Sequence, residues 1–428
     1  MAMLLGLVIA RFWLLPWLSS GLPGETAEVA ASVFSGQVRF VGAGAMSVAA
    51  IWALAGTSGS MLRSLKGIAA TARARREGEA VSLTERDLPA GIVIGTSLAL
   101  LLPVLALVWQ FNAGGPLAGA GALTLPLALV YVVVLGIVTA VVTGYMAGLV
   151  GTSNSPVSGV GILSVLAAAV LVAFFLGGYA PPGARQPLIA FTLYITSFVF
   201  GVAIVANDNL QDLKTGQLVG STPWKQQVAL VIGVVAGSLI LPPVLQLLNT
   251  SFGFAGAPGA GPNALAAPQA SLFAAIAQGV LGGEFRWDLF GAGAGIGVAV
   301  IALDELLGRM GKRRLPPLAV GMGIYLPATL VLPTIAGTVI GHVWNRMAAR
   351  ARRPEFAERM GVLLATGLVV GDSLFGLVYA GAVSAVGDPA KLAVVGPDFA
   401  PAAEIVALLA LVSLLAFTYR RTRREALQ

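Results

Sequence analysis

Long apolar runs recur along this chain and limit what it can fold into. They lie at residues 3–19, 40–62, 90–111, 123–150, 158–178, 187–206, 225–248, 287–308, 315–345, 360–386 and 404–419. Most are about 20 residues long, the length of a helix that crosses the hydrocarbon core of a bilayer. A single soluble core could not bury so many apolar helices. The sequence therefore predicts an all-α, polytopic transmembrane helical bundle of about ten spans plus re-entrant or broken helices.

Composition narrows the function classes. Of the 428 residues, 57% are hydrophobic and 11% are charged, with 54 glycines and 24 prolines, which favours closely packed and locally broken helices. The chain has no cysteine and one histidine, His342, so disulfides, thiolate sites and histidine-built metal clusters are excluded. We expect no cofactor and no resident metal. The net charge of +7 comes from basic residues in short loops, which argues for membrane orientation and against nucleic-acid binding.

Basic clusters predict the sidedness of the spans. Because arginine and lysine concentrate in cytoplasmic loops, we assign that side to residues 63–86, 309–314, 346–359 and 420–424. We expect a multi-pass protein of the cell membrane with both termini cytoplasmic. The opening residues have no basic region before the apolar run, and Arg11 interrupts that run, so we interpret them as a first span and not as a signal peptide.

The run 315–345 breaks this count, because basic clusters flank it on both sides. Pro327 and Pro333 lie within it, and proline removes a helix donor and kinks the chain. We predict a hairpin of two half-helices that enters and leaves on the cytoplasmic side. The alternative is one long kinked span that violates the charge rule.

The stretch GLVGTSNSPVSGVGI, residues 148–162, places small polar side chains between two apolar runs. Non-helical backbone at membrane depth must be enclosed by protein or line a watery cavity, and broken helices supply such backbone to transported substrates. We therefore predict that the segment lines a substrate path. A cytoplasmic turn with a helix cap fits equally well. The candidate path residues are Thr152, Ser153, Asn154, Ser155 and Pro156.

A second polar stretch, NDNLQDLKTGQLVGSTPWKQQ, spans residues 207–227. Asp208 and Asp212 are four residues apart, so a helix would place them on one face, where like charges repel unless a cation offsets them. The stretch is a candidate gate or cation site; the alternative is a solvated cytoplasmic loop. The residues concerned are Asn207, Asp208, Asn209, Asp212 and Lys214.

Asp372 lies near the middle of the run 360–386. A carboxylate at that depth costs about 2.5 to 3.5 kcal/mol on insertion scales, so it is usually protonated, paired or facing water. Asp372 is the best candidate for a proton-coupling acid. The alternative is a protonated side chain that forms a hydrogen bond to a neighbouring helix. Glu305 is expected to pair with Arg309 one turn on, as a structural contact with Asp304 beside it.

Glycine pairs at GxxxG spacing predict close helix crossings. They are residues 144 and 148, 233 and 237, 293 and 297, 337 and 341, and 367 and 371. The run GAGAGIG at 291–297 lacks the preceding strand of a nucleotide loop, so a dinucleotide site is excluded.

Three stretches together resemble one family. GLVGTSNSPVSGVGI, NDNLQDLKTGQLVGSTPWKQQ followed by GSLILPPVLQLLN, and LPPLAVGMGIYLP are similar to signature stretches of the oligopeptide transporter (OPT) family, in its bacterial and yellow-stripe-like branch. The likeness runs from about residue 40 to the C-terminus. It implies a secondary transporter that imports short peptides or metal-chelate complexes with protons.

The resemblance also has two departures. Family members are longer, with extra spans before the matched region, so we expect the C-terminal two-thirds of the fold, as one transporter domain over residues 1–428. In the late span the family usually has a glutamate in a Gly-Glu-Ala setting, where this chain has Gly371, Asp372 and Ser373. The carboxylate is kept on a shorter side chain.

Together these features predict a transporter and not an enzyme. We expect Tyr325 of the predicted hairpin to line the substrate path with Asn154, Ser155 and Pro156, and Asp372 to couple protons. The partners would be substrate, protons and lipid, with a homo-oligomer allowed. Membrane aspartyl proteases need a second aspartate in a setting that this sequence lacks. The remaining alternative is a non-transporting subunit or fragment that needs a partner chain with the missing spans.

Overall fold

The computed structural model describes the chain at residues 1–24, 26–53, 55–56, 82–151, 155, 157–178, 185–254, 257, 264–265, 267–282, 286–311, 314–387, 389–396 and 399–427. Within these residues the regular secondary structure is helical, apart from one isolated bridge between Phe254 and Leu265. Nine described helices are long and apolar enough to cross a membrane. The predicted polytopic all-α class is therefore confirmed.

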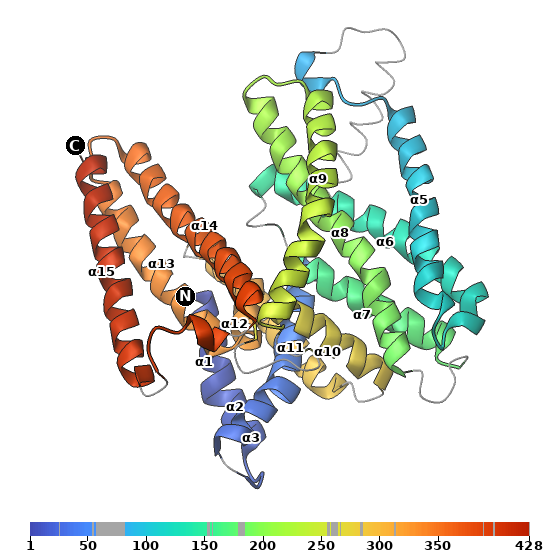
Figure 1. Ribbon diagram of the computed structural model, residues 1–428, viewed down its shortest axis with the longest axis horizontal. Coiled ribbons are helices and arrows are strands. Elements are labelled where there is room, and N and C mark those ends of the chain that lie inside the picture. Colours follow the sequence, from blue (N-terminus) through green and yellow to red (C-terminus); the bar gives the residue numbers. More distant parts are fainter. Residues whose placement is uncertain are drawn as a thin grey trace. The chain divides into compact units, whose positions relative to one another are not determined.

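Most of the helices coincide with the apolar runs, and Figure 1 shows their arrangement. They are α1 (Ala2–Val8), α2 (Leu15–Ser19), α3 (Thr26–Val33), α5 (Ala90–Ala113), α6 (Gly121–Val150), α7 (Val157–Leu176), α8 (Arg185–Leu218), α9 (Pro223–Ser251), α10 (Pro268–Gly282), α11 (Trp287–Arg309), α12 (Pro317–Tyr325), α13 (Ala328–Ala348), α14 (Pro354–Val386) and α15 (Ala400–Leu427). Residues 39–53 form a further helix, called here the 39–53 helix. Two π-helical turns, Ile9–Leu14 and Phe34–Val38, join α1 to α2 and α3 to the 39–53 helix.

The chain divides into two compact units. Unit 1 comprises Met1–Val234 and Pro268–Val331, and unit 2 comprises Val235–Ala267 and Leu332–Gln428. That both units act together as one transporter domain over residues 1–428 stays a prediction.

Side chains from α6, α7 and α8 make one core of unit 1. Phe191, Ile195 and Val199 of α8 are fully buried there, with Tyr131 of α6. The Tyr131 hydroxyl donates a hydrogen bond of 2.8 Å to the Ser164 carbonyl oxygen of α7. A buried hydroxyl needs such a partner, so this bond fixes how α6 and α7 face each other.

Glycines hold a second group of unit 1 helices at backbone distance. A Cβ atom on Gly6 of α1 would overlap the Val320 carbonyl oxygen of α12, and one on Gly42 of the 39–53 helix would lie 2.8 Å from the Cα of Tyr325. Small residues permit such close approach between membrane helices. The short helix α12 is therefore in backbone contact with both α1 and the 39–53 helix.

The predicted GxxxG contacts are confirmed at one pair and half of another. Cβ atoms on Gly293 and Gly297 would meet the carbonyl oxygens of Val41 and Ala45, so α11 packs closely on the 39–53 helix. Gly144 of α6 meets α8 in the same way, whereas Gly148 does not. At the other three pairs, no described atom of the same unit lies within 4 Å of an added Cβ: residues 233 and 237, 337 and 341, and 367 and 371.

The run 315–345 is broken, as the prolines predict. Helix α12 ends at Tyr325, Leu326 is extended with φ −76° and ψ 145°, and α13 begins at Ala328 after Pro327. The second proline, Pro333, lies inside α13. This break fits both the predicted hairpin and one long kinked span, and the return of the chain to the cytoplasmic side stays a prediction.

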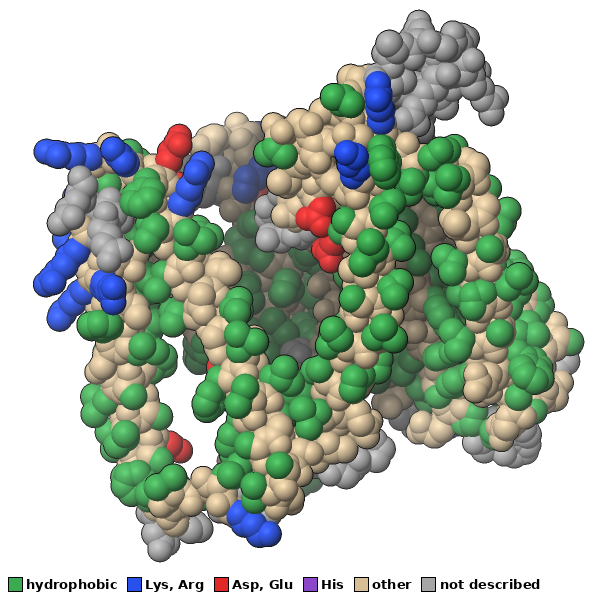
Figure 2. Space-filling view, turned by 45° about the horizontal axis from the view of Figure 1, so that its top comes forward, with side chains coloured by type: hydrophobic (Ala, Val, Ile, Leu, Met, Phe, Trp, Pro, Cys, Tyr) green, Lys and Arg blue, Asp and Glu red, His purple; other side chains and the backbone are tan. Residues whose placement is uncertain are grey.

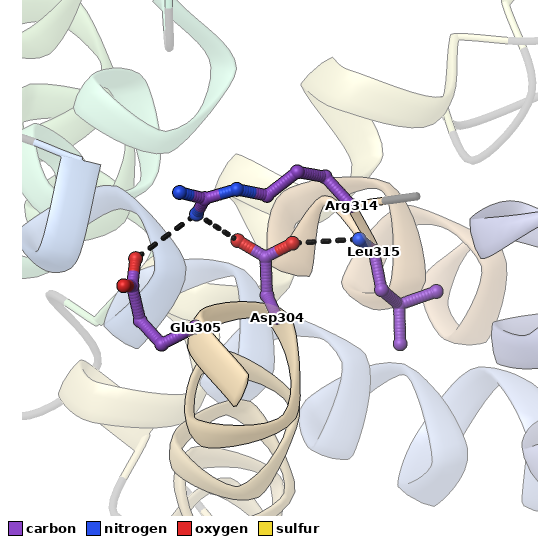
Figure 3. Close-up of polar contacts among 4 residues, drawn as sticks. All are labelled: Asp304, Glu305, Arg314 and Leu315. Atoms are coloured by element: carbon purple, nitrogen blue, oxygen red, sulfur yellow. Dashed lines mark hydrogen bonds and ion pairs between the residues drawn. The ribbon is translucent and has the colours of Figure 1, made fainter. Parts of the chain in front are cut away.

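A polar contact connects the end of α11 to the start of α12 (Figure 3). The buried Asp304 accepts hydrogen bonds from the Leu315 backbone N–H at 2.6 Å and from Arg314 Nη1 at 3.0 Å. Arg314 also donates to Glu305 at 3.0 Å. The prediction that Glu305 pairs with Arg309 is therefore wrong. The chain turns back after α11, and this turn brings Arg314 to both carboxylates. These two contacts raise the pKa of the Arg314 guanidinium above its ordinary value.

In unit 2 the basic clusters share one end. The indole N–H of Trp344 in α13 donates to the Ala357 carbonyl oxygen of α14 at 2.9 Å, and its ring meets that of Tyr419 in α15 at 5.5 Å. The end of α13, the start of α14 and the last part of α15 therefore meet. Figure 2 shows basic side chains gathered at that end of these helices and hydrophobic ones along their length. The clusters at 346–359 and 420–424 lie on the same side, and its cytoplasmic identity stays a prediction.

The contact of α11 with the 39–53 helix predicts a difference between two neighbouring glycines. We expect Gly293→Ala to destabilise the detergent-solubilised protein by about 1 to 3 kcal/mol, because the new methyl group must displace the Val41 carbonyl. Gly295→Ala in the same helix meets open space, so its unfolding midpoint should stay level or rise slightly. Thermal unfolding of both variants measures this, and equal midpoints would contradict the close crossing.

Candidate functional site

A cavity of about 190 Å³ lies in unit 1 where several helices begin or end. It is lined by Met46, Ser158, Ile162, Gln269, Leu272, Met322, Tyr325 and Leu326. Ser158 is the second residue of α7, Gln269 the second of α10, and Tyr325 the last of α12. The 39–53 helix closes the wall with Met46.

The polar residues of the cavity wall lie at helix ends. The first N–H groups of a helix and its last carbonyl groups have no partner inside the helix, so they can face a ligand or water. Three polar residues, Ser158, Gln269 and Tyr325, belong to a wall that is otherwise apolar. Such a mixture is typical of small-molecule sites, in which a few polar groups orient a ligand among apolar contacts.

Buried side chains hold Tyr325 in place. Its side chain is 3% exposed, and its backbone lies against Gly42, where a Cβ atom would meet it. The Leu326 N–H closes the end of α12 by donating to the Met322 carbonyl oxygen at 2.9 Å. Tyr325 therefore has a fixed position at the break between α12 and α13.

The predicted path segment reaches this cavity through Ser158. Thr152, Ser153, Asn154 and Pro156 lie outside the described residues. Ser155 is described, and its hydroxyl donates to the Thr143 carbonyl oxygen of α6 at 3.4 Å. The segment 148–162 and Tyr325, predicted separately from the sequence, thus meet at one cavity through Ser158. The roles of the path residues themselves stay predictions.

The same segment is joined to α8. The Thr143 hydroxyl donates to the Ala203 carbonyl oxygen at 2.7 Å, and Gly144 lies close enough to Ala206 for an added Cβ to sit 3.3 Å from its carbonyl oxygen. Ala203 is one helical turn before Asn207. The two polar stretches of the sequence are therefore neighbours across the α6–α8 contact.

The stretch 207–214 is helical and not a loop, because α8 continues to Leu218. Asp208, Asp212 and Lys214 are exposed, whereas Asn207 is 5% exposed. The Oδ1 atoms of Asn207 and Asn209 are buried without a hydrogen-bond partner among the described residues. Lys214 donates to Gln217 at 2.8 Å. The structure therefore encloses the amides of this stretch and leaves its carboxylates outside; a gate or cation site here stays a prediction.

Asp372 belongs to unit 2. It lies within α14, and its side chain is exposed in that unit. The neighbouring Ser373 hydroxyl donates to the Val369 carbonyl oxygen of its own helix at 3.0 Å. The position agrees with a carboxylate near the middle of a long apolar helix, and its proton-coupling role stays a prediction.

Sequence reasoning missed Met46 and Gln269 as wall residues. Met46 belongs to an apolar run with no local signal, and Gln269 follows a Gly- and Pro-rich loop. The start of a short helix after that loop was the available signal for Gln269. Among the described residues, no group of three His, Cys, Asp or Glu side chains could hold a metal ion.

Because the natural chain has no cysteine, single cysteines can test whether water enters this cavity. We expect Ser158→Cys to react with a water-soluble cationic methanethiosulfonate about tenfold or more faster than Ser164→Cys. Ser158 lines the cavity, whereas Ser164 is 2% exposed and donates to the Val160 carbonyl oxygen. Labelling followed by intact-mass spectrometry gives the two rates. Equal rates would show that the cavity is not connected to water.

Residues 1–383 match the family described as OPT oligopeptide transporter protein. This match begins at residue 1, earlier than the expected residue 40, and ends before α15. No solved structure matches the chain.

The relatives cover different shares of the chain. A Haemophilus influenzae protein named as an oligopeptide transporter is 35% identical over 405 residues, which is 90% of this chain and 63% of that protein. An Arabidopsis thaliana protein and an Oryza sativa protein, both named as metal-nicotianamine transporters, are 29% and 27% identical over 48% of this chain and 28% of their own length. The chain thus spans less than two-thirds of these relatives. With its apolar helices and this match, the chain is a multi-pass membrane protein and belongs to the OPT oligopeptide transporter family.

Proposed function

We propose that this chain is a secondary active transporter that moves short oligopeptides or metal-chelate complexes, driven by protons. The observation that supports this most is the cavity at the meeting point of α7, α10 and α12. Its wall combines helix ends with Ser158, Gln269 and Tyr325. In broken-helix transporters such helix ends bind the substrate within the bundle.

The size of the cavity suggests which part of a substrate it receives. Pockets that enclose a whole drug-sized ligand measure about 300 to 1,000 Å³, whereas this one is about 190 Å³. It has room for one side chain or one end of a short peptide. The remainder of the substrate would lie along the segment 152–156, which precedes Ser158 in the chain.

Two further roles belong to the same proposal. Asp372 is the proton-coupling acid. A carboxylate within an apolar helix raises the free energy of membrane insertion, and it changes its charge when it takes up a proton. The end of α8 from Asn207 to Lys214 is the gate, because the buried Oδ1 atoms of Asn207 and Asn209 have no hydrogen-bond partner in the part of the chain that the structure describes. Residues 1–428 would act as one transporter domain.

A different function is a subunit that needs a partner chain. The two relatives named as metal-nicotianamine transporters and the Haemophilus protein are all longer than the part matched here. Uptake by the purified chain alone supports the transporter. Uptake that appears only with a second chain supports the subunit.

The direct test is uptake into proteoliposomes. The purified chain in phosphatidylcholine vesicles should accumulate labelled tripeptides, or a ferric chelate, when the outside is made acidic. Collapse of the pH gradient with a protonophore should reduce uptake to passive exchange. Absence of uptake for both substrate classes, from vesicles with correctly inserted protein, would overturn the proposal.

Asp372→Asn separates coupling from binding. We expect gradient-driven uptake to fall to the passive level while exchange of internal and external substrate continues, because the amide cannot take up a proton. Glu404→Gln, a carboxylate change at the start of α15 in the same unit, is the matched control and should keep gradient-driven uptake. Full accumulation by Asp372→Asn would remove the coupling role.

A further inference from the structure

Two arginines share one aromatic ring beside the cavity. The guanidinium carbon of Arg11 lies 4.3 Å from the ring centroid of Phe34, and that of Arg39 lies 5.6 Å from the same centroid. Arg39 is also 5.4 Å from the centroid of the Tyr325 ring. A cation within about 6 Å of an aromatic centroid is attracted to the ring face. The Phe34 ring therefore contacts both guanidinium groups.

The described residues leave this positive charge without a counter-charge. The Nε atoms of Arg11 and Arg39 are buried and have no hydrogen-bond partner among the described residues. The ion pairs of the described chain involve Arg286 and Arg314 instead. Glu28 of α3 is exposed and pairs with neither arginine. Two like charges around one ring repel each other, so a bound anion would stabilise this arrangement.

Local backbone geometry places both side chains. Arg11 lies inside the π-helical turn Ile9–Leu14, and Arg39 directly follows the π-helical turn Phe34–Val38. Such turns insert one extra residue into a helix and occur often at functional sites. Arg11 also lies within a candidate membrane span, Ala2–Ser19. A charged residue there is costly and usually marks a substrate or ion path.

We propose that Arg11 and Arg39 form the binding site for a carboxylate group of the transported substrate. This inference rests on the proposed transport function and names the substrate chemistry: a molecule with a free carboxylate, such as the C-terminus of a peptide or a carboxylate of a chelate. The planar guanidinium presents paired N–H donors that match the two oxygens of a carboxylate.

The position of Tyr325 connects this site to the cavity. Its ring contacts Arg39 on one side, and the same residue lines the cavity with Met322 and Leu326. A substrate whose apolar part enters the cavity would therefore place its charged end near the arginine pair. The cavity selects the size of the side chain, and the arginines select the charge.

The test compares a carboxylate with its uncharged amide. In thermal unfolding of the full chain in a neutral detergent, trialanine or citrate should stabilise the protein, and trialanine amide should not. Arg11→Gln and Arg39→Gln should each raise the ligand concentration that gives half of this stabilisation about tenfold or more. Arg286→Gln, a change at an exposed arginine paired with Asp288, is the matched control and should leave it unchanged.

A second measurement needs no variant and remains valid if the variants misfold. Phenylglyoxal modifies accessible guanidinium groups, and peptide mass spectrometry gives its rate at each arginine. Citrate should slow modification at Arg11 and Arg39 and not at Arg286. Equal rates with and without citrate, or equal stabilisation by trialanine and its amide, would overturn the inference.

The outcomes also separate this inference from the proposed function. If phosphatidylglycerol or inorganic phosphate protects both arginines while trialanine and citrate do not, the site binds phosphate groups and the inference is overturned. Uptake of trialanine and its amide at equal rates would support the transport function and reject the carboxylate site. Arginine-dependent binding of trialanine in a chain that takes up neither peptides nor chelates would reject transport instead.

Discussion

Backbone contact at glycine is the interaction on which unit 1 depends. Between membrane helices the hydrophobic effect offers little, since lipid tails are as apolar as leucine side chains. Cohesion comes from dispersion at close range and from hydrogen bonds between helices. At Gly6, Gly42 and Gly293, a single methyl group would collide with the main chain of the neighbouring helix. These contacts place α1, α11, α12 and the 39–53 helix within reach of one another.

The position of the candidate site follows from that packing. Because Gly42 lets the 39–53 helix approach α12, Met46 and Tyr325 can share a wall of the cavity. Asp304 holds the other end of α12 by accepting from the Leu315 N–H. Both ends of this nine-residue helix are therefore held within unit 1, and its last residue, Tyr325, lies between the cavity and Arg39.

Much of the helical layout could be predicted from the sequence because the bilayer imposes one length scale. Apolar runs such as 90–111 and 158–178 became α5 and α7 with small changes at their ends. The break at Pro327 was also predictable, since proline cannot donate within a helix. The partner of Glu305 could not be predicted in this way. The turn after α11 brings Arg314 back to Glu305, and the i to i+4 spacing of a helix gives no information about contacts made by a turn.

The candidate site was only partly predictable, for a related reason. Polar residues in apolar runs mark positions such as Ser155 and Asp372, but a cavity depends on which helices meet. Met46 lies in an apolar run with no local signal, and only the start of a short helix after a Gly- and Pro-rich loop marked Gln269. Most GxxxG pairs also had no described neighbour within their unit, because the spacing allows a close crossing without selecting a partner.

The walls of the cavity differ in how they are held. The 39–53 helix meets α12 at Gly42 and α7 at Gly159, where an added methyl group would overlap a neighbour. Helix α10 instead packs on α7 and α8 through Leu272, Phe273 and Ile276, whose rotamers can adjust. Enlarging the cavity for a bulkier ligand would disturb the fewest main-chain contacts if α10 moved outward and the other walls stayed still.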